Sequence, residues 1–414
     1  MLDAVIDEVR GRRIRIGAHW LADFASCNYL GFDLDPEIAA SIDEQVRRWG
    51  THPSWSRLLG NPRLYPDIEE RLTELLGAPD SLVLPTITHI HSFVLPVLTS
   101  GGTLMLEAQA HRTIYDGAMT AAAGGATVHR FRLDDLDRLA HLLRRAPVRA
   151  PRVVCVDGVN SMTGNPPDLP ALARTCREHG ALLYVDDAHG FGVLGERDVD
   201  ETCPYGMRGN AVVRYFGETY DDIVLVGGFS KAYSSLLAFL TAPTWLKEHL
   251  KLAAPPYLYS GPSPTASLAT VLAGFRVNSQ RGDALRADLY RKTERVLDHL
   301  DALGVHTPNV SGSPIVEVPL DDADDLHIVS KLLWDAGIYV TLAAYPLVSR
   351  ASVGFRVQLT AANSDEEVDE LLTAITALAE RSLLQTSRDR GAAALSGSPA
   401  LPRRVQDRGT PRSC

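Results

Sequence analysis

Short apolar runs alternate in the middle of the chain with longer segments whose apolar positions recur at helical spacing. Runs typical of buried strands cover residues 81–84, 103–106, 152–157, 182–185 and 223–226. Helical patterns cover residues 90–98, 113–123 and 170–179. Because successive parallel strands need a crossover, usually a helix, this alternation predicts an α/β fold around a mostly parallel sheet.

The two ends of the chain carry different patterns. Residues 1–11 are expected to be helical, and residues 14–16 to form a short strand. A long helical segment at residues 264–303 is expected to break near residues 279–282. After it, strand-like runs alternate with helical patterns, the former at residues 314–318, 338–341 and 355–359 and the latter at 324–336 and 365–384. This region is predicted to be a smaller α+β domain.

The length agrees with more than one domain, since 414 residues with 45% hydrophobic content exceed one typical core. We predict an N-terminal arm and entry segment at residues 1–50, a large domain at 51–270 and the C-terminal α+β domain at 271–385. Residues 386–414 are rich in Arg, Ser, Gly, Ala and Pro and are predicted to be a disordered tail.

Charge and cysteine content narrow the class of protein. The formal net charge of -10 gives no indication of nucleic-acid binding. We expect a soluble cytoplasmic protein without a membrane span, because the N-terminus lacks an apolar signal core and no apolar run reaches about eighteen residues. The 5 cysteines show no paired or metal-type spacing, which favours a reducing compartment and no metal site.

Lys231 and Asp186 together give the strongest indication of chemistry. Lys231 follows the 223–226 run after a Gly-Gly-Phe-Ser turn, and Asp186 ends the 182–185 run. A lysine in a pocket forms a Schiff base with an aldehyde. An aspartate opposite a pyridine nitrogen keeps that nitrogen protonated and makes the ring an electron sink. The pair therefore indicates pyridoxal 5'-phosphate (PLP) as the cofactor.

Further motifs resemble those of one family, in the same order. The Asn-Tyr-Leu-Gly-Phe segment at residues 28–32, Ser-Arg-Leu-Leu-Gly at 56–60 and Asp-Gly-Val-Asn-Ser-Met-Thr-Gly at 157–164 are similar to motifs of the α-oxoamine synthases. This family includes 8-amino-7-oxononanoate synthase, 2-amino-3-ketobutyrate CoA ligase and serine palmitoyltransferase. The resemblance covers roughly residues 20 to 383 and implies the PLP-dependent transferase fold of type I, with a large parallel-sheet domain and a smaller α+β domain.

The resemblance also implies which residues hold PLP. Lys231 matches the Schiff-base lysine, Asp186 the partner of the ring nitrogen, and His189 the group that reaches the ring oxygen. His111 matches a histidine that stacks on the ring, and either histidine can polarise the acyl carbonyl. Further PLP contacts are expected from Thr86, Ile87, Ser161, Ser230 and Ser260. Ser260, after Tyr259, is expected to reach the phosphate in a neighbouring subunit, which implies a homodimer with shared sites.

Three residues are expected to bind substrate. Asn28 and Arg356 match family residues that approach the substrate carboxylate, and Arg57 matches the arginine of the Ser-Arg loop. The fork of an arginine suits bidentate binding of a carboxylate, which lysine does poorly. The Arg-Arg-Ile-Arg cluster at residues 12–15 is expected to be a solvated face, with an acidic carrier or coenzyme A as the alternative partner.

The chain departs from the family pattern around the phosphate and the substrate. Ile90 replaces an asparagine, and Gly228 stands where the family has a threonine. Backbone N–H groups at a helix N-terminus can still hold phosphate. Residues 50–56 and Tyr65 also differ, which favours a specialised substrate.

The resemblance implies a decarboxylative condensation of an α-amino acid with an acyl thioester, either acyl-CoA or an acyl-carrier protein, giving an α-amino ketone. The residues leave two alternatives open. One is another fold type I reaction, such as transamination, aldol cleavage or β-elimination. The other is a non-catalytic partner subunit, against which the retention of both Lys231 and Asp186 argues.

Overall fold

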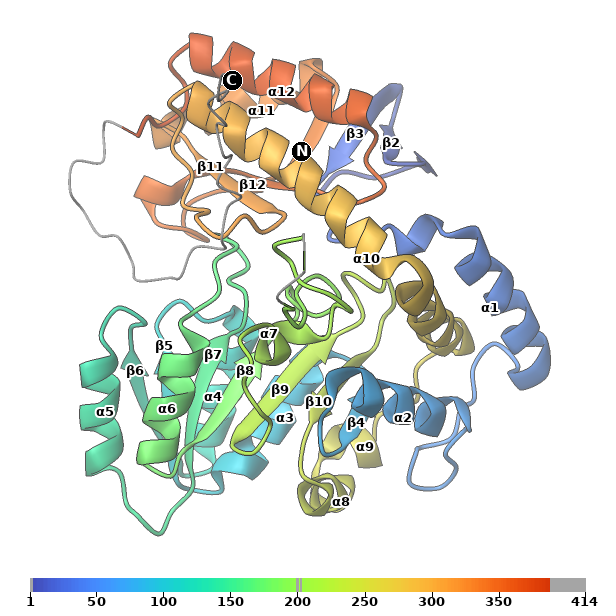
Figure 1. Cartoon of the computed structure of the whole chain (residues 1–414), viewed down its shortest axis with the longest axis vertical. Coiled ribbons are helices and arrows are strands. Elements are labelled where there is room, and N and C mark those ends of the chain that lie inside the picture. Colours follow the sequence, from blue (N-terminus) through green and yellow to red (C-terminus); the bar gives the residue numbers. More distant parts are fainter. Residues whose placement is uncertain (1–2, 199–200, 202, 388–414) are drawn as a thin grey trace, which may run out of the picture.

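Two β-sheets, bridged by the long helix α10 (Thr265–Ala302), organise the chain (Figure 1). The computed structural model describes residues 3–198, 201 and 203–387. The domain boundaries given above remain a prediction, but the separation into a larger and a smaller α/β layer is plain in Figure 1.

The large sheet has seven strands, and all but one run parallel. Its order is β4 (Ser81–Leu84), β10 (Ala238–Thr241), β9 (Ile223–Gly228), β8 (Leu182–Asp186), β7 (Arg152–Asp157), β5 (Thr103–Glu107) and β6 (Thr127–Phe131). Only β10 pairs antiparallel with its neighbours β4 and β9. The predicted mostly parallel sheet is therefore confirmed, and its central strands are apolar throughout because both faces are covered.

The connecting helices lie on both sides of this sheet. They are α2 (Leu64–Leu76), α3 (Ile87–Thr99), α4 (Arg112–Ala123), α5 (Leu136–Arg145), α6 (Leu169–Glu178), α7 (Ala211–Tyr215), α8 (Thr244–Ala253) and α9 (Pro255–Leu258). The predicted helices at residues 90–98, 113–123 and 170–179 are confirmed as α3, α4 and α6.

The second sheet joins the two ends of the chain. Its order is β1 (Glu8–Arg10), β2 (Arg13–Ile16), β3 (His19–Phe24), β12 (Ile338–Ala343), β13 (Gly354–Gln358) and β11 (Ile315–Pro319). Strand β3 pairs parallel with β12, so the N-terminal segment completes the C-terminal sheet. Helices α11 (Leu326–Asp335) and α12 (Asp365–Glu380) accompany it, as predicted.

The predicted helix at residues 1–11 is wrong. Strand β1 forms a hairpin with β2, and the turn passes through Gly11 at a φ of 57°. The backbone N–H and C=O groups of these residues form hydrogen bonds across the hairpin, in place of the bonds that they would form within a helix. The arginines of the turn and of β2 are ion-paired within the chain: Arg12 with Asp33, Arg13 with Glu370, and Arg15 with Glu8.

The predicted break near residues 279–282 is also wrong, because α10 runs through it without interruption. Gly282 is a point of close contact in this helix. A Cβ atom there would lie 2.4 Å from Oδ1 of Asn278 and 2.8 Å from a guanidinium nitrogen of Arg286. Arg286 is fully buried and donates to the carbonyl oxygen of Gly192 at 3.0 Å. The glycine therefore makes room for a buried arginine rather than ending the helix.

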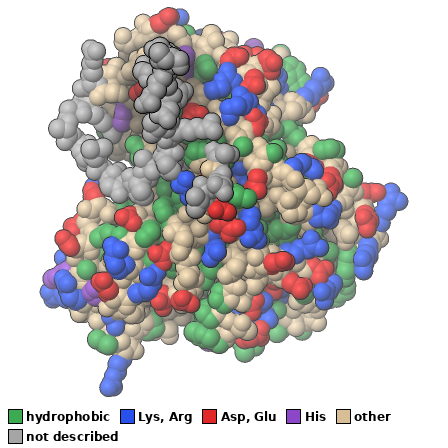
Figure 2. Space-filling view, in the orientation of Figure 1, with side chains coloured by type: hydrophobic (Ala, Val, Ile, Leu, Met, Phe, Trp, Pro, Cys, Tyr) green, Lys and Arg blue, Asp and Glu red, His purple; other side chains and the backbone are tan. Residues whose placement is uncertain are grey.

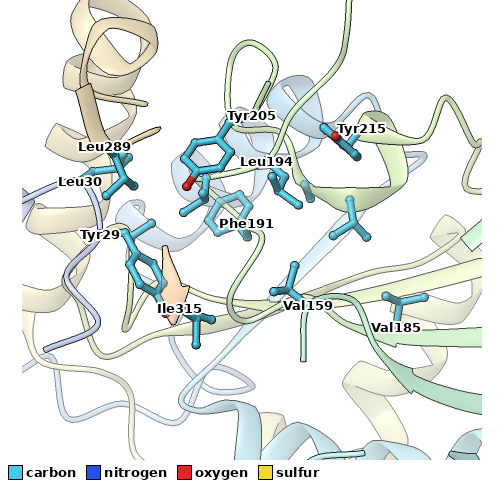
Figure 3. Close-up of a cluster of buried hydrophobic side chains, with 14 of the residues drawn as sticks. Tyr29, Leu30, Val159, Val185, Phe191, Leu194, Tyr205, Tyr215, Leu289 and Ile315 are labelled. Atoms are coloured by element: carbon cyan, nitrogen blue, oxygen red, sulfur yellow. The ribbon is translucent and has the colours of Figure 1, made fainter. Parts of the chain in front are cut away.

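A continuous apolar core connects the two sheets. Figure 3 shows side chains from the N-terminal segment, the large domain, α10 and β11 in one cluster. Tyr29, Phe191 and Tyr205 are each buried completely within it. The core therefore joins the large domain to the second sheet through direct apolar contacts.

The surface of the protein is mixed in charge, and its C-terminal segment returns to the second half of the chain. Acidic and basic side chains are interspersed on the face shown in Figure 2. Within the described residues, no helix combines the length and apolar character needed to cross a membrane. Thr386 still pairs with Val305, whereas residues 388–414 of the predicted tail lie outside the described residues.

Candidate active site

A cavity of about 380 Å³ opens at the carboxyl ends of β7, β8 and β9. Parallel α/β sheets bind ligands at this edge because the strand-to-helix loops converge there. The cavity wall includes the predicted residues Thr86, Ile87, His111, Ser161, Asp186, His189, Ser230 and Lys231. The sequence is thus folded so that residues far apart along the chain surround one space.

Asp186 and Lys231 lie in this wall from neighbouring strands, β8 and the segment after β9. Burial acts to raise the pKa of Asp186, but a hydrogen bond from His91 and the positive charge of Lys231 outweigh it, so the pKa lies below its usual value. Burial lowers the pKa of the Lys231 amine, and Asp186 opposes this shift. The site therefore presents a carboxylate beside an amine that loses its proton more easily than a free lysine.

Two further carboxyl groups at the same strand ends behave differently. Burial raises the pKa of Asp157 well above its usual value, and the neighbouring Asp186 adds to this effect. Asp157 lines the cavity and accepts a hydrogen bond from the backbone N–H of His111 at 3.0 Å. Burial likewise raises the pKa of Asp187. Asp187 accepts from the backbone N–H of Val212 at 2.9 Å and is absent from the cavity wall, so Asp186 is the carboxylate offered to a ligand.

The two predicted histidines differ in their surroundings. His189 is buried, and its Nδ1 lies 2.7 Å from the hydroxyl of Tyr29. Burial lowers the pKa of His189 well below its usual value, so the ring is neutral and its Nε2 remains for a ligand. His111 caps the N-terminus of α4, where its Nδ1 contacts Oγ1 of Thr113 at 2.8 Å. Desolvation lowers the pKa of His111 as well.

The N-terminus of α3 forms the opposite wall. Thr86 is the N-cap, and its hydroxyl accepts from the N–H of His89 at 3.2 Å. Ile87 and Thr88, the first two residues of this helix, lie in the cavity wall. Free N–H groups and the helix dipole make such an end favourable for phosphate.

Gly228 explains part of the altered phosphate region. A Cβ atom at this position would lie 2.6 Å from Cδ1 of Ile87. The Ile87 side chain thus occupies the space that a larger residue at position 228 would need. The glycine at the end of β9 is therefore matched to the isoleucine at the first turn of α3.

The residues predicted to bind substrate, Arg356 and Asn28, are not part of the cavity wall. Arg356, on β13, donates to the carbonyl oxygen of Ser161, and its charge acts on the pKa values of Lys231, His111 and His189. Its Nε has no hydrogen-bond partner among the described residues. An unsatisfied donor beside the lysine is suitable for a carboxylate.

Asn28 is absent from the cavity wall, but its neighbour Cys27 lies close to Lys231. The Cys27 thiol donates to Oε1 of Gln358 at 2.6 Å, and Cys27 is close enough to Lys231 to affect the pKa of its amine. The sequence interpretation gave Cys27 no role, and the substrate role predicted for Asn28 stays a prediction.

Arg57 and Ser260 do not line the cavity. Arg57 is buried and donates to Asn61, to the carbonyl oxygen of Val83 and to Glu69, at 3.0, 2.5 and 2.9 Å. Its guanidinium lies over the ring of Tyr65, which accounts for the unusual tyrosine there. Ser260 donates only to the carbonyl oxygen of Gly261, at 3.2 Å, within the described residues. The roles predicted for Arg57 and Ser260 stay predictions.

The sequence interpretation also missed His91. Its ring is fully buried between Tyr184 and Asp186. The signal was available, since His91 shares the buried face of α3 with Val94 and Leu95 at helical spacing. A histidine on an otherwise apolar helix face requires a buried partner.

These residues fit PLP. Asp186 supplies a buried anion for the ring nitrogen, Lys231 an amine for the aldehyde, and the α3 N-terminus free N–H groups for the phosphate. The neutral His189 and His111 lie in the same wall. The cavity volume of about 380 Å³ also suits a molecule of this size.

Comparisons with known proteins agree with this arrangement. The family model described as aminotransferase class I and II matches residues 22–375. The 8-amino-7-oxononanoate synthase of Chromohalobacter salexigens is 34% identical over 355 residues, covering 84% of this chain and 87% of that protein. The protein of the same name from Pseudomonas putida is 31% identical over 374 residues, covering 90% and 91%.

Solved structures show the same fold. Serine palmitoyltransferase from S. paucimobilis, with a bound PLP–myriocin aldimine, superposes with a TM-score of 0.83 at 25% identity, covering 91% of this chain and 92% of that one. Serine palmitoyltransferase from Sphingomonas wittichii gives a TM-score of 0.82 at 26% identity, covering 92% of each chain.

Proposed function

Because this chain belongs to the aminotransferase class I and II family, and within it to the α-oxoamine synthases, we propose that its cavity joins an α-amino acid to an acyl thioester with loss of carbon dioxide. The product of this PLP-dependent condensation is an α-amino ketone. The observation that carries the proposal is the convergence of Lys231, Asp186, His189 and His111 in one wall, with Arg356 beside it.

PLP, when bound, supplies an electron sink that stabilises negative charge at the amino-acid Cα. The chain supplies everything else. Lys231, Asp186, His189 and the first turn of α3 hold the cofactor, and His111 covers its ring. Ser161, Thr86, Ile87 and Ser230 complete the wall that surrounds it.

Arg356 and the segment around Asn28 orient the amino acid. The unpartnered Nε of Arg356 binds the substrate carboxylate and thereby fixes which Cα bond is weakened. Cys27, bonded to Gln358, adjoins the same position. These contacts restrict which amino acid is accepted.

Lys231 is the base that removes the Cα proton of the amino acid. The lowered pKa of its amine gives a larger fraction of neutral base than a free lysine has. The Nζ atom takes the Cα proton and later returns one. His189 or His111 polarises the acyl carbonyl through an imidazole N–H, since burial lowers the pKa of His189 well below its usual value and desolvation also lowers the pKa of His111.

We also propose a homodimer in which each subunit completes the site of the other. Large apolar side chains are exposed on the single chain: Leu236 is 59% exposed, Tyr259 82%, and Leu59 83%. Leu236 itself lines the cavity. A second copy of the chain would bury these side chains and bring Ser260 towards the phosphate.

The identity of the substrates rests on the chain's differences from its relatives. Ile90, Gly228, residues 50–56 and Tyr65 depart from the family pattern, so we propose an amino acid or acyl chain outside the primary-metabolism reactions. Free thiols at Cys27, Cys155, Cys176 and Cys203 agree with a cytoplasmic location.

The condensation is tested with carboxyl-labelled amino acids and a panel of acyl-CoA and acyl-carrier thioesters. We expect labelled carbon dioxide only when a thioester is present, in step with free thiol. After acyl transfer, the new ketone makes loss of the carboxylate easy. Thiol release with the label retained would indicate acyl transfer alone, and label loss without thioester would indicate a simple decarboxylase. Either result would overturn the proposal.

A further inference from the structure

His91 joins two groups of β8 through its two ring nitrogens. Its Nδ1 lies 2.9 Å from the hydroxyl of Tyr184, and its Nε2 lies 2.9 Å from Oδ2 of Asp186. Tyr184 and Asp186 are two residues apart on the strand and so face the same side, towards α3. His91 is fully buried there. The three residues form a continuous hydrogen-bonded chain that ends at Asp186 in the cavity wall.

The direction of these hydrogen bonds follows from the partners. Burial raises the pKa of Tyr184 well above its usual value, so the hydroxyl keeps its proton. That hydroxyl makes no other hydrogen bond among the described residues, so it donates to Nδ1 of His91. The ring proton then resides on Nε2, which donates to Asp186. Tyr184 thereby selects the His91 tautomer with its proton on Nε2, which is the one that can donate to Asp186.

The other charged groups around Asp186 do not replace this bond. Lys231 attracts the charge of Asp186 from across the cavity, whereas Asp157 and Asp187 lie close enough to interact unfavourably with it. His111 faces it from α4. The other oxygen, Oδ1, accepts only the backbone N–H of Ala188, at 3.0 Å. His91 is the group whose side chain holds Oδ2.

We propose that His91, oriented by Tyr184, is a positioning residue that keeps Asp186 ionised and aimed at the ring nitrogen of PLP. This inference rests on the proposed function only for the identity of the cofactor. It assigns a role to α3 beyond its N-terminus: one helix holds the phosphate at its first turn and the carboxylate one turn later. Outer partners of this kind fix both orientation and basicity of the group they contact.

Removing the donor leaves Asp186 buried with less to stabilise its charge. Since a depressed pKa returns upward when the favourable partner is lost, the carboxyl then takes up a proton at a higher pH. PLP binding weakens where Asp186 is neutral, because the pyridinium loses its counterion. The weakening of PLP binding is therefore absent at alkaline pH and grows as the pH falls.

The matched variants are His91→Asn and His91→Gln. The glutamine amide reaches the position of Nε2 and can donate to Asp186, whereas the shorter asparagine amide cannot. His299→Asn is the control for a helix histidine far from the cavity, which contacts Leu372 and Thr376. Tyr184→Phe removes only the hydroxyl that selects the tautomer. Thermal unfolding of each apoprotein reports any loss of fold.

The readout is the PLP dissociation constant of each variant relative to the wild type across the pH range. For His91→Asn we expect a ratio near one at high pH that rises roughly 10- to 100-fold towards acid pH, the range for loss of a charged hydrogen bond. His91→Gln should follow the wild type more closely, and Tyr184→Phe should lie between them. With ¹⁵N-labelled PLP, the ring-nitrogen shift should move towards the unprotonated value only in the variants whose binding weakens.

Identical pH profiles and ring-nitrogen shifts for His91→Asn, His91→Gln and the wild type would overturn the inference. So would weakening by the asparagine variant that is equal at all pH values, which indicates a packing role. Neither outcome bears on condensation. Conversely, a wild type that binds PLP but does not condense substrates would overturn the proposed function and leave this test intact.

Discussion

At the scale of single residues, the site sorts chemically similar groups by their surroundings. Asp157, Asp186 and Asp187 all lie at the ends of neighbouring strands, yet only Asp186 has a pKa below its usual value. The difference arises because only Asp186, of the three, has a hydrogen bond with the His91 ring, whereas burial dominates the pKa values of the other two. When the surroundings shift the pKa values of neighbouring groups in opposite directions, one group can be charged and another neutral at the same pH.

Lys231 is expected to carry the cofactor. Lys231→Ala should abolish condensation and the covalent attachment of PLP together, because no other amine is placed opposite Asp186 in the described cavity wall. Borohydride reduction of the wild-type holoprotein followed by peptide mapping checks the assignment. Attachment of PLP to a different lysine would show it to be wrong.

Asp186 is expected to be the counterion of the ring nitrogen. Asp186→Asn keeps the shape but removes the charge, and turnover should fall by roughly a hundredfold or more. The measurement is the rate of thiol release at saturating PLP. Asp187→Asn is the matched comparison, since Asp187 bonds to the backbone of Val212 outside the cavity wall and should affect stability more than turnover. Near-normal turnover of Asp186→Asn would exclude this role.

Arg356 is expected to bind the substrate carboxylate through its fork. Arg356→Lys keeps the charge but loses bidentate geometry, so KM for the amino acid should rise by about tenfold or more. The PLP dissociation constant should change little, because the residue contacts Ser161 rather than the phosphate region. A loss of PLP binding equal to the loss of amino-acid binding would contradict this assignment.

At the scale of elements, close contacts decide which helices and strands can meet. Helix α10 spans both sheets without a break because Gly282 leaves room for Arg286. Ile87 of α3 likewise fits against Gly228 of β9. In each case, the absence of a side chain on one element provides the space for a side chain from another.

Gly282→Ala is expected to destabilise the protein, although alanine normally favours a helix. The added Cβ atom would lie 2.4 Å from Oδ1 of Asn278, which accepts from Arg286 at 2.8 Å. Displacing this buried pair should lower the free energy of unfolding by about 1–3 kcal/mol. Denaturant titration provides the measurement, with Gly124→Ala at the end of α4 as a control. A stabilised Gly282→Ala variant would show that the contact relaxes without cost.

At the scale of the whole molecule, large apolar side chains are exposed, among them Leu236 of the cavity wall and Tyr259. A single chain leaves Ser260 outside the cavity wall, although the sequence resemblance assigns it to the phosphate of a neighbouring subunit. The proposed dimer, with two sites each built from two chains, would account for both features.

Shared sites give a quantitative expectation. Lys231→Ala subunits and Ser260→Asp subunits are each expected to form inactive homodimers. After random subunit exchange, about one-quarter of the wild-type activity should return, because half the dimers are mixed and each has one intact site. Activity is followed by thiol release, and native mass spectrometry confirms exchange. Proven mixed dimers without activity would count against shared sites.

The sequence by itself determined the features that depend on neighbours along the chain. Apolar runs ending in Asp186 and near Lys231 predicted buried parallel strands, and the order of the motifs predicted the family. Strands buried on both faces have a local signal, and their carboxyl ends meet at one edge of the sheet. The pattern was therefore sufficient to bring the amine and the carboxylate to the same place.

Only the tertiary structure decided the contacts between distant segments. Residues 8–10 became a strand because β2 offered a hydrogen-bonding partner, and Arg57 found Glu69 and Val83 inside the protein. His91 met Asp186 across a separation of 95 residues. Such contacts depend on which side chains share a buried volume, and local periodicity carries no information about that. The sequence thus determined the strands and the reacting groups, while packing determined their charge and orientation.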